Sequence, residues 1–97
     1  MAVKRRKNPA LVVEAHPLNQ LEFLTVELYW DNEGRRYVTR IPELFNISTQ
    51  GEDEEAALDM AADQLLGWLR FMEDKGKPIP LKKTQIRKIR EVLAEQS

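Results

Sequence analysis

Hydrophobic and polar positions alternate through residues 21–31, and this period of two predicts a β-strand. One side of the predicted strand is wholly apolar and carries Leu24, Val26, Leu28 and Trp30. The other side mixes apolar and polar groups and carries Phe23, Thr25, Glu27 and Tyr29. Upstream, residues 10–15 are apolar enough for an edge strand or a docked extension. The basic segment 1–9 is too polar to order itself, so we expect a mobile arm there.

Residues 31–34 are turn formers and predict a hairpin into a second strand, residues 35–41. The facing of this second strand has two solutions. One directs three side chains to the core, namely Tyr37, Thr39 and Ile41. The other directs Val38 there, with Arg36 and Arg40 as its neighbours. Burial of two guanidinium groups is costly, so we favour the first solution on energetic grounds.

After the second strand, the pattern changes from strand to helix. Pro42 removes a backbone donor and ends the second strand. Residues 45–50 alternate again and predict a third strand with one polar face, and Gly51 marks a sharp exit from it. Asp53 is the expected N-cap of a helix over residues 54–75, because its side chain accepts hydrogen bonds from the first turn.

Apolar residues at helical spacing define the core face of this helix: Leu58, Ala61, Ala62, Leu65, Leu66, Leu69 and Met72. Gly76 predicts the end of the helix. Residues 82–95 again have helical spacing, with a narrow apolar face of Ile86, Ile89 and Leu93. The prediction is therefore an α+β, two-layer fold. It has an antiparallel β-β-β-α core in which one long helix covers the sheet, and an additional C-terminal helix.

Short motifs within residues 34–80 form a pattern that resembles the HicB-type antitoxin domain family. The matching positions are Tyr37-Val38, Pro42-Glu43-Leu44, Gly51, Glu55-Ala56 and Leu58. The chain departs from the family at Phe45-Asn46, where Pro-Gly-Cys is usual. The resemblance implies a partial RNase H-like fold over residues 10–80. The segment after it, residues 81–97, is expected from its own spacing to form a basic amphipathic helix. The resemblance also implies a function, which is to bind and neutralise a small RNA-cleaving toxin of the HicA type.

The length of 97 residues and the hydrophobic content of 42% predict one small domain with a single core. We expect a homo-oligomer, dimeric or higher, to support so small a core. The absence of cysteine excludes disulfides and thiolate metal sites. No apolar run approaches the length needed to span a bilayer. We therefore expect a cytoplasmic protein with no membrane partner and no cofactor.

The formal net charge of −1 conceals an uneven distribution of charge along the chain. Nine of the 15 basic residues lie near the two ends: Lys4, Arg5, Arg6, Lys7, Lys82, Lys83, Arg87, Lys88 and Arg90. Between them, residues 8–81 carry six basic and 14 acidic side chains, a net charge of −8. An acidic body suits a basic protein partner such as the HicA-type toxin, because complementary potentials steer encounter. Ordinary solvated charge is the alternative.

A second group of side chains projects from the long helix on the side away from its core face: Met60, Gln64, Gly67, Trp68 and Phe71. Exposed aromatic clusters usually mark interaction surfaces, so something is expected to cover this group. Three covers are open, namely the chain's own C-terminal helix, a second copy of the chain, or another protein. Met60, Trp68 and Phe71 are the candidate partner-binding residues.

The basic C-terminal helix suggests an alternative function in nucleic-acid binding. Its candidate phosphate-contacting residues are Lys82, Lys83, Arg87, Lys88 and Arg90. Only 17 residues follow Pro80, which is room for one helix and not for the DNA-binding domain that many HicB-type antitoxins carry. The alternative is therefore a stand-alone HicB-like adaptor that forms homo-oligomers, or a weak nucleic-acid binder.

The sequence offers no catalytic or metal-binding constellation. His16 is the only histidine, it precedes a proline, and we expect it to be a surface residue. Asp59 and Asp63 share one side of the long helix but face no other identifiable ligand, so we interpret them as its solvated face. No glycine-rich phosphate loop or nucleophile motif is present. We expect a binding protein and not an enzyme.

Overall fold

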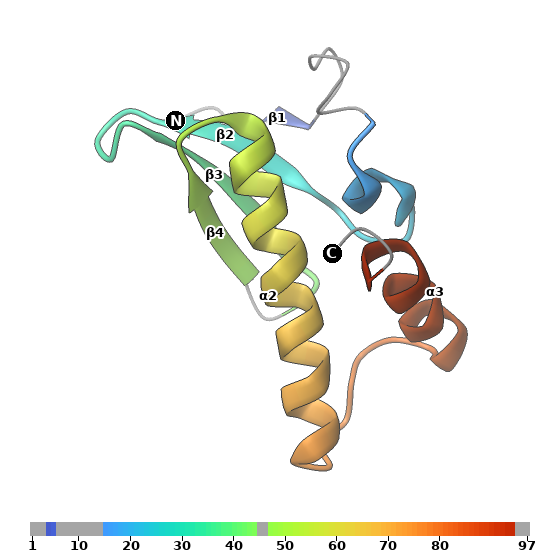
Figure 1. Ribbon diagram of the computed structural model, residues 1–97. Coiled ribbons are helices and arrows are strands. Elements are labelled where there is room, and N and C mark those ends of the chain that lie inside the picture. The colour runs from blue at the N-terminus through green and yellow to red at the C-terminus, as the bar shows by residue number, and fades with distance from the viewer. Residues whose placement is uncertain (1–3, 6–14, 45–46, 95–97) are drawn as a thin grey trace.

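The protein is a two-layer α+β fold in which an antiparallel sheet is covered on one face by a long helix (Figure 1). The computed structural model describes residues 4–5, 15–44 and 47–94. The sheet has the strand order β1-β2-β3-β4, with every neighbouring pair antiparallel. The strands are β1 (Lys4–Arg5), β2 (Glu27–Asp31), β3 (Arg36–Ile41) and β4 (Ile47–Gly51). The helices are α2 (Glu54–Asp74) and α3 (Lys83–Ala94). This architecture confirms the predicted fold class.

The hairpin of β2 and β3 confirms the favoured facing of β3. Thr39 and Ile41 are fully buried on the face that α2 covers, and Tyr37 is half-buried beside them. Val38 is buried as well, on the opposite face of the sheet. On that opposite face Arg40 stays half-exposed and lies 3.9 Å from the carboxylate of its cross-strand neighbour Glu27. Both arginines therefore avoid full burial, as the energetic argument requires.

The strand predicted over residues 21–31 is shorter in the structure, where it is β2, because the chain turns before it becomes extended. Residues Pro17–Gln20 form a short 3-10 helix, η1, and the N–H of Leu24 donates to the carbonyl of Leu21. The strand begins only at Glu27. Leu18, Leu21 and Leu24 still join the core, because turns can bury apolar side chains as effectively as a strand. Trp30, expected on the wholly apolar side, is 42% exposed at the hairpin end and contacts Tyr37 edge-on.

The turn at residues 42–44 holds the start of β2 in place. Leu44 is fully buried, and the Glu43 carboxylate accepts hydrogen bonds from Thr25. The N–H of Thr25 lies 3.0 Å from the Glu43 carboxylate oxygens, and its hydroxyl lies 2.6 Å from Oε2. The Glu43 carboxylate therefore provides a hydrogen-bond acceptor for the backbone N–H of Thr25, two residues before β2 begins.

Helix α2 begins and ends where the sequence predicts. Asp53 is the N-cap, and its carboxylate accepts from the N–H of Ala56 at 2.7 Å. Gly51 lies so close to the first turn that an added Cβ would stand 2.3 Å from the backbone nitrogen of Ala57. Gly76 has φ of 65°, a left-handed conformation that ends the helix. The core-facing residues are buried or half-buried as predicted, and Ala57 joins them.

Helix α3 lies beside α2 and next to η1, so the C-terminal helix meets the N-terminal part of the described chain (Figure 1). Ile89 and Leu93 are buried in the common core, and Ile86 is partly buried against it. At the surface, Arg90 of α3 forms an ion pair with Glu73 of α2. The predicted apolar face of the second helix is confirmed.

Part of the expected N-terminal arm is ordered into the sheet. Lys4 pairs with Leu28 and Arg5 with Glu27, which makes β1 an edge strand. A mobile arm was expected from side-chain polarity, but pairing at a sheet edge uses backbone groups and needs no apolar side chain. Residues 10–14 of the edge strand predicted over 10–15, and residues 45–46 of the predicted third strand, lie outside the described residues.

Candidate functional site

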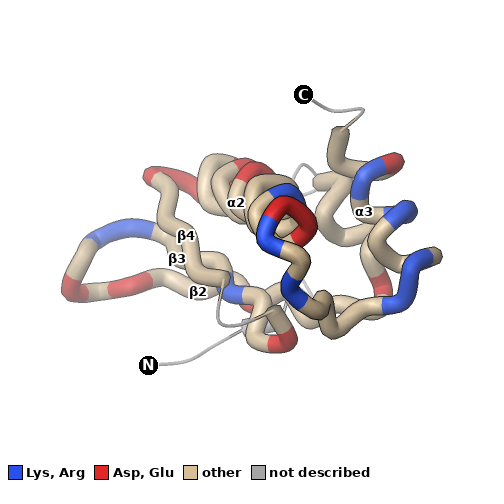
Figure 2. Tube along the Cα trace, turned by 90° about the horizontal axis from the view of Figure 1, so that it is seen from below, with Lys and Arg blue, Asp and Glu red and all other residues tan. Residues whose placement is uncertain are grey.

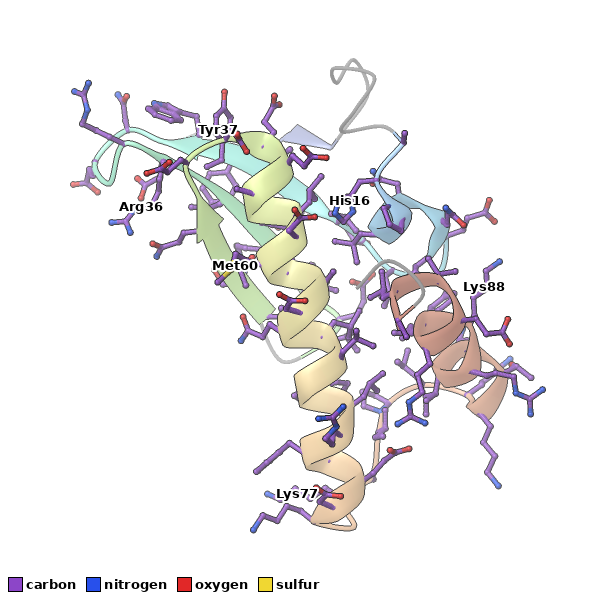
Figure 3. The ribbon with its side chains drawn as sticks, viewed as in Figure 1. His16, Arg36, Tyr37, Met60, Lys77 and Lys88 are labelled. Carbon is purple, nitrogen blue, oxygen red and sulfur yellow. The ribbon has the colours of Figure 1, made fainter. Side chains whose placement is uncertain are left out.

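His16 is buried at the contact between η1 and α2, and not on the surface as its sequence context suggested. It is 6% exposed, and its ring points toward α2 (Figure 3). Nδ1 accepts the backbone N–H of Leu18 at 3.1 Å. Nε2 lies 2.7 Å from Oδ1 of Asp59. Because a backbone N–H can only donate, Nδ1 carries no proton, and Nε2 donates its proton to the carboxylate.

Both ring nitrogens of His16 are engaged in holding local structure. Nδ1 caps η1, and Nε2 ties that turn to α2. A general base needs a nitrogen within hydrogen-bond reach of a substrate proton, and neither nitrogen offers one here. The His16–Asp59 pair is therefore a structural link. No local pattern indicated this link, because the two residues are 43 positions apart and helical spacing relates only nearby ones.

A cavity of about 560 Å³ opens where η1, α2 and α3 meet. Three exposed carboxylates line one side of it, Glu55, Asp59 and Asp63, which follow one another at intervals of four residues along α2. Its remaining lining residues are Ala15, His16, Pro17, Ala62, Leu66 and Leu93. An acidic rim around an apolar interior fits a lysine or arginine side chain, whose aliphatic part can pack while its charged end meets carboxylates. Asp59 and Asp63 are solvated, as predicted, but they also border this cavity.

The apolar outer face of α2 is formed by Met60, Gln64, Gly67, Trp68 and Phe71. Met60 is 52% exposed and Phe71 is 51% exposed. Gln64 and Gly67 are exposed, and Trp68 is half-buried at the border with the core. Figure 3 shows Met60 directed over the β4 side of the helix, away from α3. The C-terminal helix therefore does not cover this face, which removes the first of the three expected covers.

A groove of about 510 Å³ adjoins the C-terminal end of the apolar outer face. It is lined by Trp68, Phe71, Met72, Lys77 and Pro78. Its walls are mostly aromatic and aliphatic, so it fits an apolar side chain. Met60, Trp68 and Phe71 are thus brought to one side of α2, with the groove at one end.

The basic residues of the C-terminal region separate into two groups. Lys82, Lys83, Arg87 and Lys88 are exposed and have no ion pair among the described residues. Arg90, expected to join them, is instead paired with Glu73. Figure 2 shows Lys and Arg spaced along the outside of α3.

Charge is segregated between the two halves of the described chain. Residues 15–69 carry eleven acidic and three basic side chains, a net charge of −8. Residues 70–94 carry eight basic and three acidic side chains, a net charge of +5. The cavity between η1, α2 and α3 lies on the acidic part, and the surface of α3 is the basic part. The molecule therefore presents surfaces of opposite sign.

The described residues contain no group of three or more histidine, cysteine or acidic side chains arranged to hold a metal ion. Within the same ranges, no helix combines the length and the apolar character that a membrane span requires. We found no match to the chain among protein-family models, curated protein sequences or solved structures. The charge, the cavity and the exposed apolar residues are therefore the features that bear on function.

Proposed function

We propose that this protein is a HicB-like antitoxin-type binding protein, which occludes a small basic RNA-cleaving partner of the HicA type. The observation that carries the proposal is the net charge of −8 over residues 15–69, with three exposed carboxylates around a cavity on that part of the molecule. Inhibition by occlusion requires a complementary surface and no chemistry of its own. This agrees with a site in which the His16–Asp59 pair serves the fold.

The cavity suggests how a basic partner is held. A lysine or arginine of the partner enters between Glu55 and Asp63, and its aliphatic part contacts Leu66 inside the cavity. The net negative charge around the cavity accelerates encounter with a basic surface, and the effect weakens with added salt. An RNA-cleaving enzyme needs a basic surface to hold its substrate. An acidic protein bound over that surface excludes RNA.

The first test is capture of partners from a native lysate after nuclease treatment, followed by an RNA-cleavage assay with the purified partner. We expect one small basic protein to be retained without nucleic acid, and its cleavage of RNA to stop when this protein is added in equal amount. Retention of this chain alone, or a partner lost with nuclease, would contradict the proposal.

The second test assigns the surface. Glu55→Lys combined with Asp63→Lys should weaken partner binding by at least about tenfold, the effect of losing two close charge pairs. The matched control is Glu22→Lys with Glu33→Lys, which changes net charge equally at exposed positions that do not line the cavity. Calorimetric titration measures both. Equal weakening by the two pairs would show that net charge, and not the cavity, controls binding.

A second candidate function is a stand-alone HicB-like adaptor that forms homo-oligomers, or one that binds nucleic acid weakly. The exposed basic residues at the start and along the outside of α3 favour it, since none of them has an ion pair with another described residue: Lys82, Lys83, Arg87 and Lys88. The salt dependence of nucleic-acid binding separates it from the first candidate.

A further inference from the structure

We propose that the apolar outer face of α2 binds a second copy of this chain, through antiparallel packing of α2 against α2 about a two-fold axis. Met60 of this face points to the β4 side of α2 (Figure 3), whereas the acidic cavity lies on the flank of α2 that meets η1 and α3. The inference therefore does not depend on the proposed toxin-binding function.

The spacing of the exposed residues is the first argument. Met60, Gln64, Gly67 and Phe71 follow one another at intervals of four, three and four residues, a pattern that is the same in both directions. A two-fold interface must be self-complementary, because one surface meets its own copy. An axis between residues 65 and 66 places Met60 opposite the partner subunit's Phe71. The same axis places Gln64 opposite the partner subunit's Gly67.

The shapes at these positions are complementary. Gly67 is exposed, and a Cβ added there would meet nothing within 4 Å, so its lack of a side chain has no packing reason within one chain. Glycine lowers helix stability relative to alanine, and it allows two helices to approach closely. The groove beside Phe71 lies at the place that the partner subunit's Met60 reaches. Methionine is unbranched and flexible, and its sulfur contacts aromatic rings favourably.

Charge at the two ends of α2 selects the antiparallel orientation. Four acidic residues precede and begin the helix: Glu52, Asp53, Glu54 and Glu55. Basic residues dominate its other end, where Arg70, Lys75 and Lys77 outnumber the acidic Glu73 and Asp74, and Glu73 is paired with Arg90. Antiparallel packing places each acidic end beside the partner's basic end, and the helix dipoles then oppose one another favourably. The same two-fold axis places Glu54 opposite the partner subunit's Lys77.

The β4 edge of the sheet has no partner strand among the described residues. Among the described strands, β4 is paired only with β3, and α2 lies over it (Figure 1). Exposed strand edges are commonly covered or paired in soluble proteins. A second copy bound along the apolar outer face approaches this edge from the same side.

The decisive experiment uses the absence of cysteine in the chain. In the proposed register, two Gln64 residues lie only about 4–5 Å apart along the helix axis, whereas two Met60 residues lie about 16 Å apart. Gln64→Cys should therefore form a disulfide-linked dimer readily under mild oxidation. Met60→Cys alone should not, but Met60→Cys mixed with Phe71→Cys should form the mixed dimer. Lys88→Cys on α3 is the exposed control and should stay unlinked.

Sedimentation equilibrium then tests the interface without cross-linking. Phe71→Asp should raise the dimer dissociation constant by at least about tenfold, the effect of losing a central aromatic contact. Lys77→Glu should also weaken the dimer, and Glu54→Lys in the same chain should restore part of the loss. Because Phe71 is half-exposed, Phe71→Asp should fold, and its far-ultraviolet circular dichroism and urea midpoint verify this.

Three outcomes would overturn the proposal. The first is a wild-type protein that stays monomeric at all concentrations up to about 1 mM, where even a dimer with a dissociation constant of about 1 mM would be visible. The second is a dimer that Phe71→Asp leaves unchanged. The third is cross-linking of Met60→Cys to itself as readily as Gln64→Cys, which would require parallel helices or an antiparallel pair in another register.

Discussion

His16 and Asp59 are separated by 43 residues, yet Nε2 of the imidazole lies 2.7 Å from Oδ1 of the carboxylate. The two members of this pair have very different environments. The His16 side chain is 5% exposed, whereas that of Asp59 is 64% exposed. The histidine also accepts the N–H of Leu18, so it serves two elements at once. Its loss should therefore matter more than the loss of its partner.

The His16–Asp59 pair gives the first prediction. His16→Ala should lower the free energy of unfolding by about 2–3 kcal/mol, because it removes a buried side chain and leaves the N–H of Leu18 without its acceptor. Asp59→Ala should cost less than about 1 kcal/mol, because water in the open cavity can accept from Nε2. Urea unfolding measures both. Equal losses would show that the link to α2, and not the cap on η1, is the stabilising part.

The close approach of β4 to α2 gives the second prediction. Gly51→Ala should destabilise the protein by about 3 kcal/mol, because the new Cβ would press on backbone atoms of Ala56 and Ala57. Gly76→Ala is the matched control, since a Cβ there meets open space and only the left-handed φ is strained. It should cost about 1 kcal/mol. Thermal unfolding measures the loss of stability in both variants. Equal losses would contradict the steric explanation.

The contact between Glu43 and Thr25 gives the third prediction. Glu43→Ala removes the acceptor of the Thr25 N–H and hydroxyl and should cost about 1 kcal/mol, a typical value for an exposed charged hydrogen-bond acceptor. Hydrogen exchange should become faster at the start of β2. Glu22→Ala, an exposed acidic residue in the neighbouring turn, serves as the control and should leave both measurements unchanged. Unchanged exchange in Glu43→Ala would show that the turn is held by Leu44 alone.

The cations of α3 give the fourth prediction. Four exposed basic residues contacting single-stranded RNA would produce a slope of log K against log salt of about −3. Replacement of Lys82, Lys83, Arg87 and Lys88 by glutamine should abolish that slope. Arg90→Gln should leave it unchanged, because Arg90 is paired with Glu73. Fluorescence anisotropy at several salt concentrations measures the slope. A slope that survives the fourfold replacement would place the RNA contacts elsewhere.

Local patterns predicted the elements whose partners are near in sequence. The core face of α2 was visible from helical spacing, and its limits from Asp53 and Gly76, because capping depends on residues within one turn. The alternation in β3 and β4 was equally reliable, since each packs one face on the helix. The alternation of residues 21–26 was misleading. There, η1 and the Glu43 contact determine the backbone, and neither is visible as a period in the sequence.

The candidate site was predicted only in part for the same reason. Met60 and Phe71 were identified from the helix alone, because exposure on a helix follows from its period. The burial of His16 was missed, since it requires the turn of η1 to meet α2 and α3. The pairing of Arg90 was missed as well, since Glu73 lies on another helix.

The sequence by itself determined the order of β2, β3, β4, α2 and α3, the core face of each helix, the caps of α2 and the uneven distribution of charge, because these depend on neighbours within a few residues. Only the tertiary structure decided three features. These are the burial of His16 against Asp59, the acidic cavity between η1, α2 and α3, and the exposure of the apolar outer face of α2. Each depends on where one element lies against another, and that is set by packing of the whole core and not by any local period.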